Sequence, residues 1–412
     1  MTKTRIMPAN HWDWSMPVPF SQGWRIDDVI FVGGQVSADA QGRPVGAGDI
    51  AVQTRNTFEF IKRVLEEAGG DLSDIVKLNT YYQYDGEGAD ITRYWEEMTE
   101  VRKEYLADPG PVGTAVRVRG FAYEGLLIEI EAIAIVGRKK QRLMPANHWD
   151  WSIPVSFSQG WKVDDLIFVG GQISADDKGR TVAPGDIAQQ VRNVFGSIQS
   201  VLREGGAELS DLIKFNTYYE FEGEGDALRE YWEDMTRVRL EYLSDPGPAG
   251  TAVRVDGFAY EDLLIEIEGI AYVGADKQRL MPANHWDWSI PVPISQGWKV
   301  GDYIFVGGQI SGDSKGNAIG VGDIATQTRN TFENIRAVLK EAGADLEHIV
   351  RLNTYYDQIG EGQALQDYWE AMTRVRMDYL ANPGPVGTAV RVNGLGYKDL
   401  LIEIEAIAYV GS

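Results

Sequence analysis

The octapeptide Met7-Pro8-Ala9-Asn10-His11-Trp12-Asp13-Trp14 occurs three times in this chain, returning at 144–151 and at 281–288. The offset is 137 residues each time, and the later landmarks Trp95, Trp232 and Trp369 keep it. A period of this length is that of a domain, because solenoid repeats recur about every 20 to 50 residues. The sequence therefore predicts three tandem domains, each long enough to bury a core: repeat 1 at 1–139, repeat 2 at 140–276 and repeat 3 at 277–412.

Within one repeat, strand-like and helix-like patterns alternate. Asp49 is a good N-cap, and the apolar residues after it recur at steps of three and four until Gly69-Gly70. The predicted elements are strands at 26–35, 74–83, 113–119 and 126–136 and helices at 50–68 and 90–106. This order predicts an α+β fold in which both helices pack on one face of a mainly antiparallel sheet.

The last two predicted strands show how the repeats would assemble. Alternation places Arg117, Glu129 and Glu131 on the face away from the helices, where the arginine could pair with a carboxylate. The same face carries Ile133 and Ile135, so it is too apolar for open water. The nearest cover is the same face of another repeat. We therefore expect a monomeric pseudo-trimer with small-molecule clefts at the junctions of repeats 1 and 2, 2 and 3, and 3 and 1.

Composition narrows the classes of partner. Hydrophobic residues make up 44% and charged residues 24%, which is typical of a soluble globular protein. The net charge of −22 argues against nucleic acid as a partner, and the basic segments 138–142 and 277–279 are interpreted as solvated linkers between repeats. No apolar run suits a bilayer and no signal peptide is evident, so we expect a cytoplasmic protein without a membrane partner.

The cysteine, histidine and glycine content of the chain decides whether a metal or cofactor site is expected. The chain has no cysteine, and no two of its four histidines share ligand spacing, so no metal site is expected. Gly33-Gly34 lacks the spacing of a dinucleotide or phosphate loop, and no cofactor is expected.

The late carboxylate and the early histidine of each repeat are the candidates for catalysis. A partly buried carboxylate would have a raised pKa and act as general acid or base; the alternative is a carboxylate neutralised by the arginine of the preceding strand. The histidine titrates near neutrality, and the alternative is an aromatic segment that plugs the core. The predicted catalytic residues are Glu131, Glu268, Glu405, His11, His148 and His285.

An arginine, two tryptophans, an asparagine and a tyrosine in each repeat are the candidates for binding a ligand. A guanidinium suits a carboxylate, and the rings could wall an apolar or cationic pocket. The alternatives are a structural ion pair for the arginine and core packing or solvent exposure for the others. The predicted binding residues are Arg117, Arg254, Arg391, Trp12, Trp14, Trp149, Trp151, Trp286, Trp288, Asn79, Tyr81, Asn216, Tyr218, Asn353 and Tyr355.

Four motifs resemble the RidA/YjgF family, also called endoribonuclease L-PSP, over essentially the whole of each repeat. They are Pro19-Phe20-Ser21-Gln22-Gly23, the IFVGGQV run at 30–36, Asp74-Ile75-Val76-Lys77 and the IEIEAIA run at 128–134. The resemblance implies a trimer of chorismate-mutase-like domains with a sheet-lined centre and three clefts at the interfaces, here supplied by one chain. It also implies hydrolysis of enamines or imines without a cofactor, releasing ammonia.

Three positions differ from the deaminase-type members of that family. Their Pro-X-Arg-Ser arginine, which holds the substrate carboxylate, is replaced by glycine, whereas the late glutamate matches. For repeats 1, 2 and 3 in turn, the differences are Gly113, Gly250 and Gly387 for arginine, Phe20, Phe157 and Ile294 for tyrosine, and Gly33, Gly170 and Gly307 for serine. The chain therefore resembles a divergent, arginine-less branch.

Two functions follow from these residues. The first is a cofactor-free enzyme that acts on a small anionic or aromatic metabolite by hydrolysis, deamination or proton transfer with elimination. The second is a non-catalytic metabolite-binding or chaperone-like protein. The acidic charge disfavours endoribonuclease activity.

Overall fold

The computed structural model describes residues 2–411. Repeat 1 contains β1 Lys3–Ile6, β2 Gly23–Ile26, β3 Val29–Val36, α1 Ile50–Glu67, η1 Leu72–Asp74, β4 Ile75–Tyr82, α2 Ala89–Tyr105, β5 Val112–Arg117 and β6 Ile128–Ile135. Repeat 2 contains β7 Lys140–Leu143, β8 Gly160–Val163, β9 Leu166–Ile173, α3 Ile187–Glu204, η2 Leu209–Asp211, β10 Leu212–Tyr219, α4 Asp226–Tyr242, β11 Ala249–Arg254 and β12 Ile265–Tyr272. Repeat 3 contains β13 Lys277–Leu280, β14 Gly297–Val300, β15 Tyr303–Ile310, α5 Ile324–Glu341, η3 Leu346–His348, β16 Ile349–Asp357, α6 Gly362–Tyr379, β17 Val386–Val392, β18 Gly394–Leu395 and β19 Ile402–Tyr409.

Each repeat forms one mixed sheet with two helices, which confirms the predicted α+β class. The strand order in the first sheet is β1-β2-β3-β6-β4-β5, and every pair is antiparallel except β4 with β5. The Asp49 side chain caps α1 by accepting from the Val52 amide at 2.9 Å. The predicted strand at 26–35 corresponds to β3, which begins at Val29, because a turn at Asp27, with a positive φ of 52°, separates β3 from β2.

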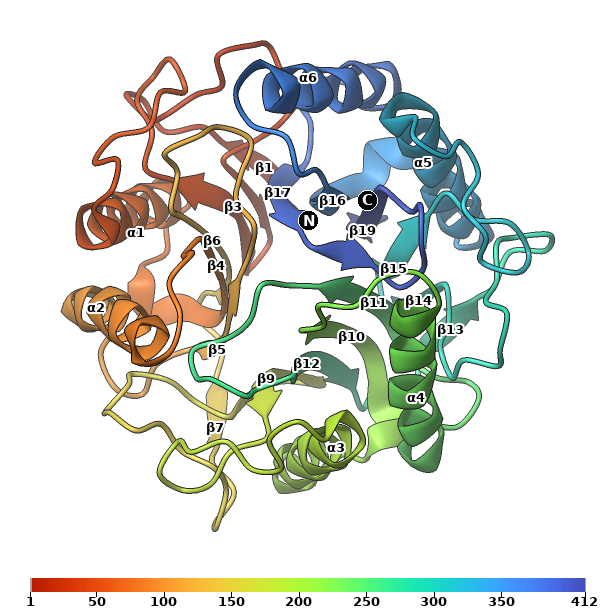
Figure 1. The fold of residues 1–412 in the computed structure, drawn as a ribbon. Helices are drawn as coiled ribbons and strands as arrows, with labels where there is room; N and C mark the ends of the chain where they lie inside the picture. Colours follow the sequence, from red (N-terminus) through yellow and green to blue (C-terminus); the bar gives the residue numbers. More distant parts are fainter. Residues whose placement is uncertain (1, 412) are drawn as a thin grey trace.

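The three repeats surround a common centre. Figure 1 shows the sheets lining this centre and the six helices on the outside, with the red, green and blue thirds of the chain related by a pseudo-threefold axis. Neighbouring sheets meet where β17 packs against β3, β5 against β9, and β11 against β15. The apolar face that the sequence left uncovered is thus buried against its own copies.

Two interpretations of local structure were wrong. The basic segments 138–142 and 277–279 are not simply linkers. Lys140–Leu143 forms β7, which pairs with β8, and Lys277–Leu280 forms β13, which pairs with β14. Arg117 does not share a face with Glu129 and Glu131. The parallel pairing of β5 with β4 sets Thr114 opposite Asn79, whose other neighbour is Glu131, so Arg117 lies on the helix side of the sheet.

A glycine carbonyl ties each repeat to the next. The Gly384 carbonyl of repeat 3 accepts hydrogen bonds from the Ser21 hydroxyl at 2.6 Å and from the Trp24 indole at 3.0 Å. Gly110 and Gly247 make the same pair of contacts with repeats 2 and 3. The backbones approach so closely here that a Cβ on Gly384 would lie 1.9 Å from the Pro19 carbonyl oxygen.

We expect Gly384→Ala to lower the free energy of unfolding by about 1–3 kcal/mol, because the added methyl group forces the two repeats apart. The matched control is Gly196→Ala in α3, where a Cβ meets nothing within 4 Å and alanine should stabilise the helix by up to about 1 kcal/mol. Urea denaturation of both variants measures the difference. Equal stability of the two would show that this contact does not constrain the junction.

Candidate functional site

Three tyrosines close the centre of the molecule. The hydroxyl groups of Tyr81, Tyr218 and Tyr355 lie 3.1–3.3 Å from one another on the pseudo-threefold axis, and all three side chains are buried. The structure therefore brings these three predicted binding residues together. Their hydroxyl groups contact one another at the axis.

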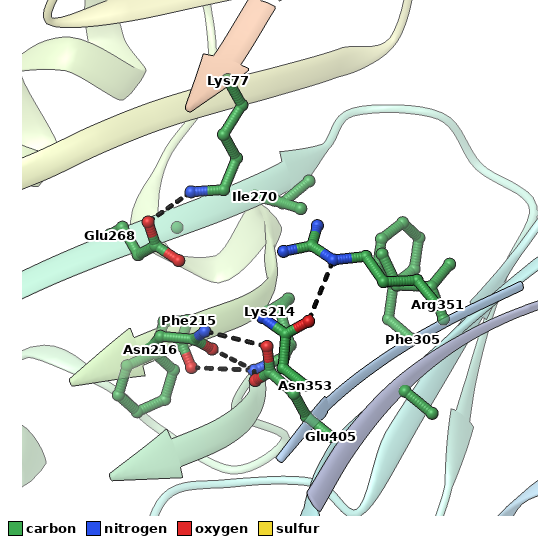
Figure 2. A pocket seen from close by; sticks show the side chains of 13 residues that line it. Lys77, Lys214, Phe215, Asn216, Glu268, Ile270, Phe305, Arg351, Asn353 and Glu405 are labelled. Atoms are coloured by element: carbon green, nitrogen blue, oxygen red, sulfur yellow. Dashed lines mark hydrogen bonds and ion pairs between the residues drawn. The ribbon is translucent and has the colours of Figure 1, made fainter. Parts of the chain in front are cut away.

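Beside the tyrosines, three buried ion pairs link the repeats. Lys77 binds Glu268, Lys214 lies 2.8 Å from Glu405, and Arg351 binds Glu131. Figure 2 shows Lys77 and Glu268, Lys214 and Glu405, and Arg351 converging from the three repeats, together with Asn216 and Asn353. The Asn353 amide donates to Glu131 at 2.8 Å, as Asn79 does to Glu268 at 3.0 Å. The cavity that remains has a volume of about 30 Å³, which is room for about one water molecule. We call this set the axial ion ring.

The axial ion ring changes the interpretation of the late glutamates. Each is neutralised by a cation of another repeat, not by the arginine of the preceding strand. Burial would raise the pKa of Glu405, but Lys214, the Thr251 hydroxyl and Arg351 outweigh burial and hold that pKa below its usual value. The predicted raised pKa is therefore wrong for Glu405. A catalytic role for Glu131, Glu268 and Glu405 stays a prediction.

Arg117, Arg254 and Arg391 fasten repeat to repeat through backbone carbonyls. Arg117 donates to the Gly86 carbonyl at 3.1 Å and to the Asp256 carbonyl of repeat 2. Arg254 reaches Asn393 of repeat 3, and Arg391 reaches Arg119 of repeat 1 at 3.3 Å. The expected pairing of Arg117 with Glu129 or Glu131 does not occur. A ligand-binding role for the three arginines stays a prediction.

The histidine of the octapeptide points into its own repeat. His11 Nε2 lies 2.7 Å from Gln35 Oε1, and Asp13 accepts from the Trp14 amide instead of orienting the imidazole. Burial lowers the pKa of His11 to about 4, so the ring is neutral at pH 7. His148 and His285 make the same contact with Gln172 and Gln309. Their predicted role as proton shuttles stays untested, and a neutral, glutamine-bound ring does not favour it.

The two tryptophans of the octapeptide differ in their surroundings. The Trp12 indole donates to Gln35 at 2.9 Å inside repeat 1. Trp14 instead crosses the junction and lies 5.3 Å, centroid to centroid, from Trp369 of repeat 3. The equivalent pairs are Trp151 with Trp95 and Trp288 with Trp232. Trp12, Trp149 and Trp286 thus support the core, whereas Trp14, Trp151 and Trp288 reach the junctions.

At the junction of repeats 3 and 1, a glutamic acid from β6 meets repeat 3. Glu129 is 4% exposed, and its carboxyl accepts a hydrogen bond from the Ala389 amide at 3.3 Å. A Cβ on Gly34 would overlap the Glu129 carboxyl oxygen, so only glycine fits beneath it. Burial and the charge of Glu131 raise the pKa of Glu129 well above its ordinary value, against the opposing effect of Arg376. Burial therefore favours the protonated form of this carboxyl.

The other two junctions repeat this arrangement. Burial raises the pKa of Glu403 to about 8 although the Ala252 amide and Lys214 oppose it, and burial together with Glu268 raises the pKa of Glu266 well above normal. We call Glu129, Glu266 and Glu403 the junction glutamic acids. Each lies two residues before a glutamate of the axial ion ring.

An arginine on the second helix of each repeat, buried in repeats 2 and 3 and partly buried in repeat 1, approaches the same junctions. Arg376 of α6 is 4% exposed, and a Cβ on Gly387 would lie 3.4 Å from its guanidinium. Arg102 approaches Gly113 in the same way at 3.1 Å, and Arg239 lies over the Phe215 ring. Burial lowers the pKa of Arg376 to about 10, so it is still a cation at pH 7. Its Nε has no hydrogen-bond partner among the described residues.

Further unpartnered donors line the same helix face. Along α6, Trp369, Thr373 and Arg376 follow at steps of four and three, which places them on one side of a helix. The Trp369 indole N–H and the Thr373 hydroxyl are buried without a partner within residues 2–411, as are their equivalents on α4, Trp232, Thr236 and the Nε of Arg239. Buried polar groups in native proteins are nearly always satisfied. These donors on one side of the helix therefore indicate a place where water or a polar ligand belongs.

Comparison with known proteins identifies the repeats. The family model described as endoribonuclease L-PSP matches residues 15–136, 152–273 and 290–410. The chain belongs to this family. It is the RidA/YjgF family that the sequence motifs resembled, and the match covers most of each repeat.

Individual relatives agree with this assignment. A RutC family protein of Pyrococcus abyssi is 42% identical over 117 residues, which are 28% of this chain and 86% of the relative. A RutC family protein of Saccharolobus solfataricus is 38% identical over 116 residues, with the same coverage. A crystal structure of a chorismatase is 16% identical, covers 81% of this chain and 93% of its own, and has a TM-score of 0.55. That last likeness concerns the fold alone.

The family site is altered in this chain more than its motifs indicated. Where the family has serine and arginine, Gly33 and Gly387 bring two backbones together, since a Cβ on Gly33 would lie 3.2 Å from the Gly387 amide nitrogen.

Sequence reasoning missed the helix arginines and gave the junction glutamic acids no catalytic role. The spacing of Trp95, Met98 and Arg102 was a usable signal, because it places the arginine on the buried face of its helix.

Within residues 2–411, no group of three histidine, aspartate or glutamate side chains is arranged to hold a metal ion. Over the same residues, no helix is both long enough and apolar enough to cross a membrane.

Proposed function

We propose that the junctions bind a small metabolite that carries a carboxylate, and that the chain is a cofactor-free enzyme in which the junction glutamic acids supply the proton. The supporting observation is a buried arginine, Arg376, whose Nε has no hydrogen-bond partner within residues 2–411. Arg376 faces Glu129, and burial raises the pKa of that carboxyl well above its usual value, which disfavours the carboxylate as a counter-ion. A buried unpaired charge is costly, so a carboxylate ligand would offset that cost.

The helix arginine also bears on the missing family arginine. In deaminase-type relatives, the arginine of the penultimate strand holds the substrate carboxylate. Arg376 approaches the corresponding Gly387 from α6, on the side where that arginine would begin. A guanidinium supplied by the helix would serve the same bidentate recognition.

The junction glutamic acids suit enamine and imine hydrolysis. A carboxylic acid can protonate the methylene carbon of a 2-enamine acid, which leaves an iminium ion and a glutamate carboxylate. Water then adds to the iminium carbon and returns a proton to the carboxylate, after which ammonia leaves and the keto acid is released. A general acid works best when its pKa lies near the operating pH, and the pKa of about 8 at Glu403 meets this condition.

Ammonia release from freshly generated 2-aminoacrylate tests the proposal. We expect acceleration by the wild-type chain and loss of about 100-fold or more in the triple variant Glu129→Gln, Glu266→Gln, Glu403→Gln. The matched control replaces Glu67, Glu204 and Glu341 by glutamine. These side chains are exposed and equivalent in the three repeats, so this variant should keep full activity. Circular dichroism checks that all variants are folded.

The helix arginines are tested by changing Arg102, Arg239 and Arg376 together to methionine. We expect KM for 2-aminoacrylate to rise by about tenfold or more, since a charge-assisted contact to the carboxylate is lost. Methionine keeps the packing volume, and replacing a buried charge by an apolar residue is often neutral for stability. An unchanged KM would remove the arginines from substrate binding.

A non-catalytic binding protein is the second candidate. The close approach of Gly33 to Gly387 and the packing of Trp14 on Trp369 favour it, because both reduce the space at the junction. If wild-type protein fails to accelerate ammonia release but binds pyruvate with an affinity that the arginine variant loses, this candidate replaces the enzyme.

A further inference from the structure

A second kind of cavity lies at one end of the pseudo-threefold axis, apart from the junctions. It has a volume of about 340 Å³, and equivalent residues of all three repeats line it. Phe31, Phe168 and Phe305 form one tier of its wall and are nearly fully buried. We call it the axial vestibule. Its volume is within the range of small-molecule sites, which begins near 300 Å³.

The rim of the axial vestibule is acidic. Asp27, Asp28, Asp164, Asp165 and Asp302 line the cavity, and Arg138 is the one cation among its lining residues. Arg138 already binds Asp28 and lies 3.4 Å from Asp164. The rim therefore keeps an excess of negative charge over an apolar interior.

Below the rim, tyrosines replace aliphatic residues in two of the repeats. Tyr303 of repeat 3 stands where repeat 1 has Val29, and Tyr409 stands where it has Ile135. The rings of Tyr303 and Tyr409 lie 5.0 Å apart at 56°, and Phe31 lies 6.3 Å from Tyr303. Aromatic faces beneath carboxylates are the surroundings in which proteins bind quaternary ammonium ions.

The floor of the axial vestibule is closed. Ile270, Phe305 and Ile407 separate it from the small cavity of the axial ion ring, since these three residues line both spaces. Beyond that ring the three tyrosine hydroxyls meet on the axis. A ligand would therefore enter from the rim, place an apolar tail among the phenylalanines and keep a charged head beside the aspartates.

We propose that the axial vestibule binds one organic ammonium ion with a short apolar tail per chain. The acidic rim selects the cation, the tyrosines contact its head and the phenylalanine tier takes the tail. This site is separate from the junctions, and its occupancy does not depend on the proposed reaction.

Isothermal titration with hexyltrimethylammonium tests the proposal, with hexanoate as the anion of matched tail length and hexanol as the neutral one. We expect saturable binding of one cation per chain, about tenfold or more tighter than either comparison ligand. A ligand of the junctions would instead bind at up to three sites per chain. The triple methionine variant of the helix arginines should bind the cation as the wild type does.

The chain itself supplies the variants for this test. Tyr303→Val and Tyr409→Ile install the residues of repeat 1, so we expect folding to be kept and cation affinity to fall by about fivefold or more. Gly301→Asp adds a carboxylate where repeats 1 and 2 have Asp27 and Asp164. All three positions share a positive φ of 50–52°, so aspartate fits, and affinity should rise.

Two results would overturn the proposal. Equal affinity for the cation, hexanoate and hexanol would overturn the selection by charge. Cation affinity that is unchanged in Tyr303→Val, Tyr409→Ile and Gly301→Asp would place the ligand elsewhere and overturn the site.

Discussion

Arg351→Met is expected to lower the free energy of unfolding by about 3–5 kcal/mol, because it leaves the carboxylate of Glu131 buried without its counter-charge. Arg351 binds Glu131 across the junction of repeats 3 and 1, and both side chains are at least nine-tenths buried. The Asn353 amide and the Thr388 hydroxyl, at 2.8 and 2.7 Å, cannot replace a full positive charge. Denaturation by urea, followed by circular dichroism, measures the loss.

Two further variants separate the ion pair from the bulk of the side chain. Arg374→Met removes an exposed arginine paired with Glu370 and should change stability by no more than about 0.5 kcal/mol. The double variant Arg351→Met, Glu131→Gln removes both charges and should recover much of the loss. If the double variant were as unstable as Arg351→Met alone, packing and not charge would govern the ring.

The 137-residue period and the helix patterns predicted most of the fold. The 137-residue offset predicted three equivalent units, and the stripe that begins at Ile50 predicted α1 to within a residue, since the capping carboxylate of Asp49 fixes where the helix starts. The inner faces of the sheets pack on one another, so apolar residues lie on both sides of each strand. Alternation alone therefore could not tell which side of β5 faces the helices.

The residues of the candidate site were harder to assign for the same reason. Lys77, Asn79 and Tyr81 lie two residues apart, so they share one face of their strand. Their partners come from other repeats, 137 or more residues away, and no local pattern reports such contacts. Glu129 and Glu131 share one face, yet burial raises the pKa of Glu129 well above its usual value whereas Glu131 is held by Arg351. That difference depends on which cation each meets across the junction.

A second large effect is expected from pH. The stability of the wild-type chain should fall as the pH rises from about 6.5 to 8, by about 2 kcal/mol from Glu403 alone. The pKa of Glu403 is raised from 4.5 to about 8 in the folded state. The folded chain therefore holds a proton that the unfolded chain has lost over this interval. The resulting stability is complete below pH 4.5 and is lost as the pH rises towards 8.

The direction of this change distinguishes the acids from the histidines. Burial lowers the pKa of His11 from 6.5 to about 4, so its contribution changes between those values, where stability rises with pH, and is constant above 6.5. Glu129 and Glu266, with pKa values well above normal, act in the same sense as Glu403. Glu220, whose pKa burial raises to about 7, adds to the fall in the lower part of the interval.

Thermal unfolding of the wild type and of the triple glutamine variant of the junction glutamic acids, at several pH values from 6.5 to 8, measures this effect. Glutamine keeps the shape of a neutral carboxyl and cannot ionise, so the variant should keep only the shallow slope that Glu220 leaves. The variant with Gln at 67, 204 and 341 should follow the wild type, because those side chains are exposed in both states. A junction variant with the full wild-type slope would mean that the junction glutamic acids are already ionised at pH 6.5. They would then lack the proton that the proposed reaction requires.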